Sequence, residues 1–153
     1  MQKKSAGFLM YRSRNKLIEV LLVHPGGPFW VKKDIAAWSI PKGEFTSEDP
    51  LAAAKREFLE ETGLKAEGDL IPLTPIKQPS GKKVFAWAFT GDCDPAQVKS
   101  NTFSMEWPRG SGELGTFPEI DQAKWFLIEM AKEKILRAQL PFLVELEQFL
   151  QSN

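Results

Sequence analysis

The alternation of apolar and polar residues predicts strands near the start of the chain and further along it. Residues 7–12 and 18–24 are rich in aliphatic, β-branched and aromatic side chains, and the polar residues 13–16 between them suit a turn. The same character predicts three further strands, at residues 37–40, 84–90 and 123–127. The chain should therefore contain a sheet whose first two strands are neighbours.

Three segments have helical patterns. In residues 50–61, Asp49 can cap the first amide groups, Pro50 fits the first helical position and Gly63 can end the helix. Apolar residues recur at helical spacing in residues 128–136 and 141–150. This order of strands and helices is compatible with a mixed α/β domain.

Residues 101–118 contain several Gly and Pro residues, and we expect them to form a long loop. Loops of this length are uncommon in compact domains unless they are functional or disordered. Glu106 and Arg109 lie in this segment.

Composition narrows the class of protein. The chain has 153 residues, of which 42% are apolar and 26% charged, which is typical of one compact domain over residues 1–153. One cysteine, Cys93, cannot form an internal disulfide, so we expect a reducing, cytoplasmic compartment. No leader or membrane segment is indicated, because no apolar run reaches the ~20 residues that span a bilayer. The formal net charge is zero, which makes nucleic acid an unlikely main partner.

The chemistry is concentrated in the helix predicted over residues 50–61. Glu57, Glu60 and Glu61 are spaced at i, i+3 and i+4 and share one face of that helix. Three neighbouring carboxylates repel one another, so the face is either screened by solvent or occupied by a cation. Oxygen ligands without Cys or His suit Mg²⁺ or Mn²⁺, which commonly serve phosphate substrates. For a Glu-rich helix in isolation, a solvated surface is the simpler interpretation.

The residues around this helix favour the cation. Residues 56–64, read Arg-Glu-Phe-Leu-Glu-Glu-Thr-Gly-Leu, follow Glu48 after seven residues and follow Gly43 further upstream. This arrangement resembles the sequence box of the Nudix hydrolases, here spanning residues 43–64. One departure is that four residues separate Gly43 from Glu48, where the family has five. Loops absorb length changes readily, so we expect the helix to be intact and the position of Glu48 to be most affected.

The resemblance implies a Nudix-type α/β/α sandwich with a mixed central sheet. It implies a metal-dependent pyrophosphohydrolase, using Mg²⁺ or Mn²⁺, in which water attacks a phosphorus of a nucleoside diphosphate linked to another moiety. A dinucleoside polyphosphate or a nucleoside triphosphate would be the substrate, and a homodimer is possible. The alternative is a non-catalytic Nudix module that binds a nucleotide or an RNA end for regulation.

The resemblance also assigns roles to residues. Glu57, Glu60 and Glu61 would be metal ligands, with Glu48 and the carbonyl of Lys42 as further candidates, and Glu57 could orient or deprotonate the attacking water. Arg56 would orient the carboxylates, while Gly43 would allow close approach of the backbone. Some family members have a general base on a late loop, for which Glu106 is the candidate here. The substrate candidates are Lys42, Gly43, Lys32, Trp30 and Arg109. For Lys32 and Trp30 a solvated or packing role fits equally well, and for Arg109 an exposed position is the simpler interpretation.

Overall fold

The computed structural model describes residues 3–152, and its centre is a mixed sheet. Within the described residues this sheet has six strands, paired in the order β4-β5-β1-β2-β8, with β3 added beside β1. The pair β1–β5 is parallel and the other pairs are antiparallel. The bounds of its strands are β1 Lys4–Arg14, β2 Leu17–Pro25, β3 Lys42–Phe45, β4 Ile71–Lys77, β5 Lys83–Thr90 and β8 Ile120–Leu127.

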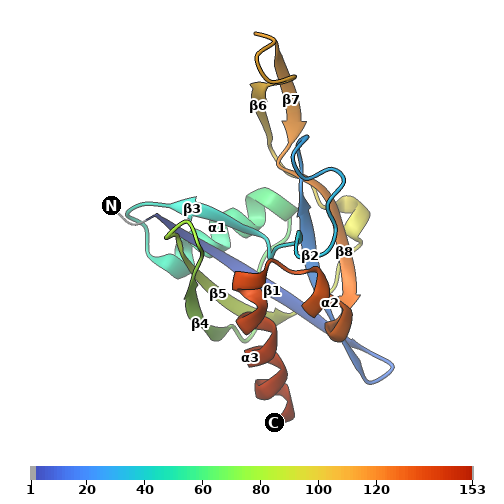
Figure 1. Ribbon diagram of the computed structural model, residues 1–153. Helices are drawn as coiled ribbons and strands as arrows, with labels where there is room; N and C mark the ends of the chain where they lie inside the picture. Colours follow the sequence, from blue (N-terminus) through green and yellow to red (C-terminus); the bar gives the residue numbers. More distant parts are fainter. Residues whose placement is uncertain (1–2, 153) are drawn as a thin grey trace.

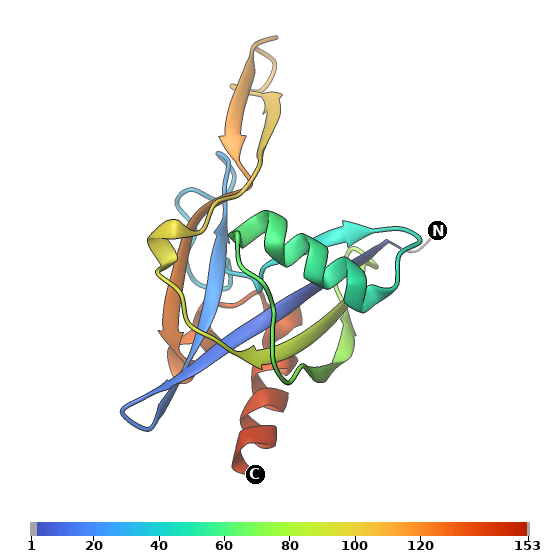
Figure 2. The same cartoon turned by 180° about the vertical axis from the view of Figure 1, so that it is seen from behind.

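Helices cover both faces of the sheet, as the α/β/α expectation requires. Helix α1 (Pro50–Thr62) lies on one face, and α2 (Ile128–Lys134) and α3 (Leu140–Gln151) lie on the other (Figures 1 and 2). Each interface has its own core: Phe8 and Phe58 pack at the α1 side, whereas Trp38, Phe142 and Leu146 pack at the α2 and α3 side. Short 3₁₀ turns lie at Pro95–Gln97 and Arg137–Gln139. Among those residues, no helix is both long and apolar enough to cross a membrane.

Strand β1 changes partner along its length. Lys4 to Gly7 pair with β3, whereas Tyr11 to Arg14 pair with β2 through the hairpin turn at Asn15 and Lys16. Both turn residues have positive φ, as a two-residue hairpin turn requires. The exchange of partners brings β3, and with it Gly43, to the start of β1 and beside α1.

The segment expected to be a long loop is instead largely a β-hairpin, so that expectation was wrong. Strands β6 (Thr102–Glu106) and β7 (Leu114–Pro118) form a two-stranded sheet that projects from the body (Figure 1). In β6, half-buried Phe103 and Met105 alternate with exposed residues, which is the period of two expected for a strand. The Gly and Pro residues that flank this short pattern obscure it in the sequence. Phe103 lies against Gly27, so the root of the hairpin packs on the loop after β2.

The sheet differs from the sequence expectation at two other places. Residues 37–40 form isolated bridges, Val23 with Ser39 and Trp38 with Ile135, and the strand begins only at Lys42. Strand β4 was not predicted, because Pro72 and Pro75 interrupt its pattern. It lies at the edge of the sheet and contains an irregular register, where proline is tolerated.

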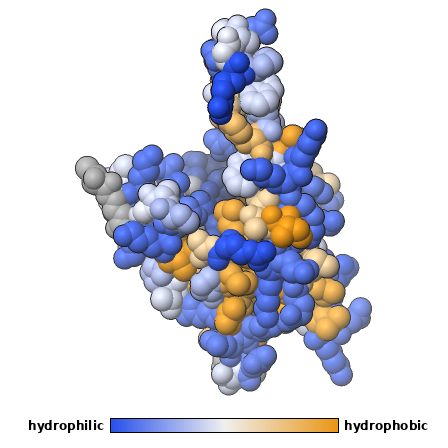
Figure 3. All heavy atoms as spheres, in the orientation of Figure 1, coloured by the Kyte–Doolittle hydropathy of each residue, from blue (hydrophilic) through white to orange (hydrophobic). Residues whose placement is uncertain are grey.

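The surface is mixed in polarity. Figure 3 shows hydrophilic residues over much of one face and at the outer end of the hairpin, with apolar residues gathered on the body below it. In the loop after β2, Phe29, Val31 and Ile35 are about half exposed or more. Trp107 in the hairpin packs edge-on against Phe29, with ring centroids 5.7 Å apart.

Candidate functional site

Helix α1 positions Glu57, Glu60 and Glu61, which together form the acidic face of the helix. The side chain of Asp49 accepts a hydrogen bond from the amide of Ala52, Pro50 occupies the first turn, and Gly63 ends the helix in a left-handed conformation. Phe58 and Thr62 are buried on the side toward the sheet, with the alanines that precede them. Glu57 and Glu61 lie on the adjoining face of the helix, where they contact β3 at Gly43 and Lys42.

Gly43 brings the backbone of β3 against the side chain of Glu57. A Cβ atom added to Gly43 would lie 2.0 Å from Oε2 and 2.1 Å from Cδ of Glu57, closer than any real contact. The Glu57 side chain is 15% exposed, and its contact with the backbone of β3 restricts its position. A residue with a side chain at position 43 would have to displace the carboxylate.

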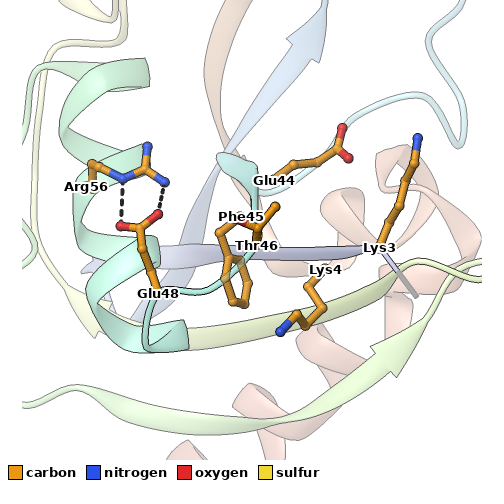
Figure 4. Close-up of a pocket in the computed structure, with 7 residues that line it drawn as sticks. All are labelled: Lys3, Lys4, Glu44, Phe45, Thr46, Glu48 and Arg56. Atoms are coloured by element: carbon orange, nitrogen blue, oxygen red, sulfur yellow. Dashed lines mark hydrogen bonds and ion pairs between the residues drawn. The ribbon is translucent and has the colours of Figure 1, made fainter. Parts of the chain in front are cut away.

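Arg56 holds three carboxylates around the same helix face. Its Nε and Nη2 donate to both oxygens of Glu48, at 2.9 and 2.5 Å (Figure 4). Its Nη1 donates to Glu57 at 2.8 Å and to Glu60 at 3.5 Å. These bonds lower the pKa of the Glu48 carboxyl and raise the pKa of the Arg56 guanidinium. The loop before Glu48 is one residue shorter than in the family, and Glu48 still pairs with Arg56.

The ionisable groups at and beside the acidic face have shifted pKa values. Burial, together with the charges of Glu57 and Glu119, raises the pKa of Glu61 to about 8, against the lowering effect of Lys42. Burial also raises the pKa of Glu57, although its bond to Arg56 opposes this. Burial and the charge of Lys82 lower the pKa of Lys42, against Glu61 and Glu44. Such shifts are typical of functional sites.

Glu119 is the acidic residue that the sequence reasoning did not identify. Its charge acts on both Glu57 and Glu61, and its backbone is held by hydrogen bonds with Asn101 and Gly26 at 2.9 Å each. It lies between the hairpin and β8, just after Pro118. The local signal was weak, since an isolated Glu before a strand is common on protein surfaces.

Four of the predicted residues lie elsewhere. Glu106 ends β6 at the far side of the hairpin from its root, and its carboxylate accepts the amide of Gly110 at 2.6 Å. Arg109 lies over the ring of Phe29, with its guanidinium carbon 5.7 Å from the centroid. Trp30 packs against the α2 and α3 core, and Lys32 lines a different cavity, beside His24 and Asp121. The structure therefore does not bring Glu106 to the acidic face, because hairpin pairing directs it outward.

The residues present suit a hard divalent cation. Glu57, Glu61 and Glu119 offer carboxylate oxygens, which Mg²⁺ prefers, and their mutual repulsion is what a bound cation would relieve. Because Gly43 has no side chain, the Glu57 carboxylate can pack directly against the backbone of β3. In residues 3–152 no three such side chains already converge as ligands, so binding would draw these carboxylates together.

Comparison with known proteins gives the family context. A model of the NUDIX domain matches residues 1–146. No curated protein sequence matches the chain.

Solved structures show the same fold. The C. elegans Ap4A hydrolase in a binary complex is 24% identical, covers 99% of both chains and has a TM-score of 0.66. A second structure of C. elegans Ap4A hydrolase is 25% identical over 98% of this chain and 99% of that one, with a TM-score of 0.63. The NUDIX domain of Shewanella oneidensis NrtR, complexed with ADP ribose, is 13% identical over 98% of this chain and 89% of that one, with a TM-score of 0.67.

Proposed function

Because the chain belongs to the Nudix family and is a hydrolase of pyrophosphate bonds, we propose that it is a metal-dependent enzyme acting on nucleotides. The substrate would be a dinucleoside polyphosphate or a nucleoside triphosphate, and the metal Mg²⁺ or Mn²⁺. The observation that carries this proposal is the pair Glu57 and Glu61, which are partly desolvated and repel each other, with Glu57 packed against the backbone of Gly43.

Glu57, Glu61 and Glu119 would hold the cation, with Glu60 and the Lys42 carbonyl as further candidates. A bound divalent cation would neutralise charge on the pyrophosphate and make water more acidic. Glu57 would orient or deprotonate the attacking water, since its raised pKa makes it a better base than an ordinary carboxylate. Arg56 would keep Glu57 in position through the 2.8 Å bond.

Two further features support a nucleotide substrate. The names of similar structures refer to Ap4A hydrolase and to ADP ribose, and both ligands contain phosphates linked to adenosine. Lys42 lies next to Gly43, close enough to Glu61 for their charges to interact, where its ammonium could bind a phosphate oxygen.

The test is a product analysis. Purified protein is incubated with diadenosine polyphosphates, nucleoside triphosphates, nucleotide sugars and ADP-ribose, with Mg²⁺, with Mn²⁺ or with EDTA, and the products are separated by chromatography. We expect cleavage of at least one class with metal and none with EDTA. Cleavage that persists in EDTA would contradict the metal dependence.

A non-catalytic nucleotide-binding module is the second candidate. It is disfavoured by the complete set of Arg56, Glu57, Glu60 and Glu61, since a protein that only binds does not need every acid. Tight nucleotide binding by calorimetry, with no cleavage of any substrate in the panel, would establish this alternative.

A further inference from the structure

Gln139 is a fully buried polar residue in the 3₁₀ turn between α2 and α3. Its Oε1 accepts a hydrogen bond from the amide of Ile40 at 3.0 Å, and its Nε2 donates to the hydroxyl of Ser39 at 3.0 Å. That hydroxyl donates in turn to the carbonyl of Ile40 at 2.7 Å. Both ends of the side-chain amide therefore hold two consecutive residues just before β3.

This bridge continues a backbone ladder at the point where the backbone turns away. The amide of Trp38 donates to the carbonyl of Lys134 at 2.9 Å, and the amide of Leu136 donates to the carbonyl of Trp38 at 2.8 Å. In a parallel ladder the next bond would join the amide of Ile40 to the carbonyl of Leu136. That carbonyl instead accepts the amide of Gln139 in the 3₁₀ turn, at 2.9 Å. The side chain of Gln139 thus supplies the acceptor that the ladder has lost.

The Ile40 amide depends on this acceptor. Ile40 is fully buried, so water cannot take the place of the Gln139 oxygen, and buried amides are almost always paired. The sheet holds the other side of the segment, where Ser39 and Val23 exchange two backbone hydrogen bonds of 2.9 Å each. Gln139 therefore fixes the side of the segment that the sheet leaves open.

The segment held by this bridge continues through Pro41 to the acidic face. The backbone amide of Lys42 donates a hydrogen bond to the carboxyl group of Glu61, and the α-carbon of Gly43 packs against the carboxylate of Glu57. Main-chain atoms make both contacts, so these contacts depend on where the backbone lies. Pro41 has a restricted φ, which leaves little freedom between the bridge and the acidic face.

We infer that Gln139 is a positioning residue of the candidate functional site, because it sets the backbone against which Glu57 and Glu61 are held. Its effect on metal binding rests on the proposed function, whereas its effect on the backbone does not. The inference deepens that function, since it makes the turn between α2 and α3 necessary for a site whose carboxylates lie on α1.

The test compares Gln139→Leu, which removes both hydrogen bonds, with Gln139→Glu, which keeps an oxygen that can accept the Ile40 amide. The matched control is a truncation of Leu146, which is buried in the core under α3. Of Leu146→Val and Leu146→Ala, the one whose melting temperature is nearer to that of Gln139→Leu is used. This control reproduces the loss of stability and leaves the bridge in place.

Amide hydrogen exchange in EDTA, resolved by residue, reports on the backbone without metal or substrate. Relative to the control, Gln139→Leu should speed exchange of the Ile40 and Lys42 amides about tenfold, because local opening becomes easier there. In Gln139→Glu both amides should stay within about twofold of wild type. Exchange that is unchanged at both amides in Gln139→Leu would overturn the inference.

Binding of Mn²⁺ without substrate, measured by electron paramagnetic resonance, tests the consequence for the site. Gln139→Leu should bind Mn²⁺ about tenfold more weakly than the control, as expected when a residue that orients metal ligands is lost. Equal affinities in these two proteins would overturn the inference. A wild-type protein that binds no Mn²⁺ would contradict the proposed function alone, and exchange at Lys42 would then decide whether Gln139 positions the backbone.

Ser39→Ala keeps the inference testable if Gln139→Leu does not fold. It weakens the bridge from its other end, since the Nε2 of Gln139 loses its acceptor. This variant should speed exchange of the Ile40 and Lys42 amides about threefold, which is a smaller effect because the Ile40 amide keeps its own acceptor. Unchanged exchange at both amides would overturn the inference.

Discussion

The carboxylate of Glu57 lies against the α-carbon of Gly43, so closely that a methyl group on Gly43 would be 2.0 Å from Oε2. The contact joins β3 to α1 at the point where the site residues meet. It explains in physical terms why a glycine occupies position 43: any side chain would push the carboxylate away from its place beside Arg56.

The first prediction concerns this contact. Gly43→Ala should lower kcat about 100-fold, the cost expected when a reacting group moves by about 1 Å. Kinetics and a melting curve measure the effect. The control is Gly68→Ala, where the new Cβ meets nothing within 4 Å but φ is +85°. It should cost about 1 kcal/mol of stability with kcat unchanged. Wild-type activity in Gly43→Ala would show that Glu57 can move without consequence.

Glu57→Gln should lower kcat by about 10² to 10⁴, because it removes the charge needed to orient or accept a proton from water. The fold should persist, since the side chain keeps its volume and the buried site loses a desolvated charge. The comparison variant is Glu60→Gln, whose side chain is 46% exposed and should matter less. Steady-state kinetics on both variants decide the ranking, and similar losses in both would remove the distinction between these two glutamates.

The stability of the metal-free protein should fall as the pH rises from about 5 to 8. The folded pKa of Glu61 is about 8, above its ordinary value of 4.5, so the folded state binds more protons in this window. A group that holds more protons when folded stabilises the protein at low pH and loses that effect as the pH passes its folded pKa. Thermal melts in EDTA measure the trend, which Glu61→Gln should flatten. Mg²⁺ should raise the melting temperature more at pH 8 than at pH 5, and a flat wild-type profile would contradict the assignment.

Arg56→Ala should reduce activity about 10- to 100-fold, the range for residues that orient metal ligands. The reason is that Glu57 loses the donor that holds it at 2.8 Å. Glu48→Gln removes one partner of Arg56 and leaves the bond to Glu57, so its loss of activity should be smaller. Activity as a function of Mg²⁺ concentration gives the readout, and an equal loss in both variants would mean that Glu48 acts directly at the site.

Asp49→Ala should affect stability and not turnover. The Asp49 carboxylate accepts the Ala52 amide at 3.2 Å at the start of α1. Loss of such a cap costs about 1 kcal/mol. Chemical denaturation and kcat under the same conditions measure the two effects, and a large fall in kcat at unchanged stability would place Asp49 in the site.

The local features of this protein could be predicted from its sequence. Helix α1, with Asp49 at its start and Gly63 at its end, is specified by residues within a few positions of one another. The same is true of the Glu57 and Glu61 spacing, because three or four residues make one helical turn.

What could not be predicted depends on residues far apart in the chain. Glu119 belongs to the site because β8 pairs with β2, which no local pattern specifies. Glu106 was the candidate because its surroundings read as a loop, yet pairing with β7 fixes it at the outer end of the hairpin. The pocket in Figure 4 likewise exists only once β1, β3 and α1 have come together.

The parallel pairing of β1 with β5 has a consequence for synthesis. Lys4, near the start of the chain, pairs with Lys83, so β1 has left the ribosome long before its neighbour on that edge is made. Its early partner β2 pairs only with Tyr11 to Arg14, on the other edge of β1. The nascent chain therefore carries an apolar strand with an unpaired edge until more than half of it has been translated, and such edges invite association with other chains.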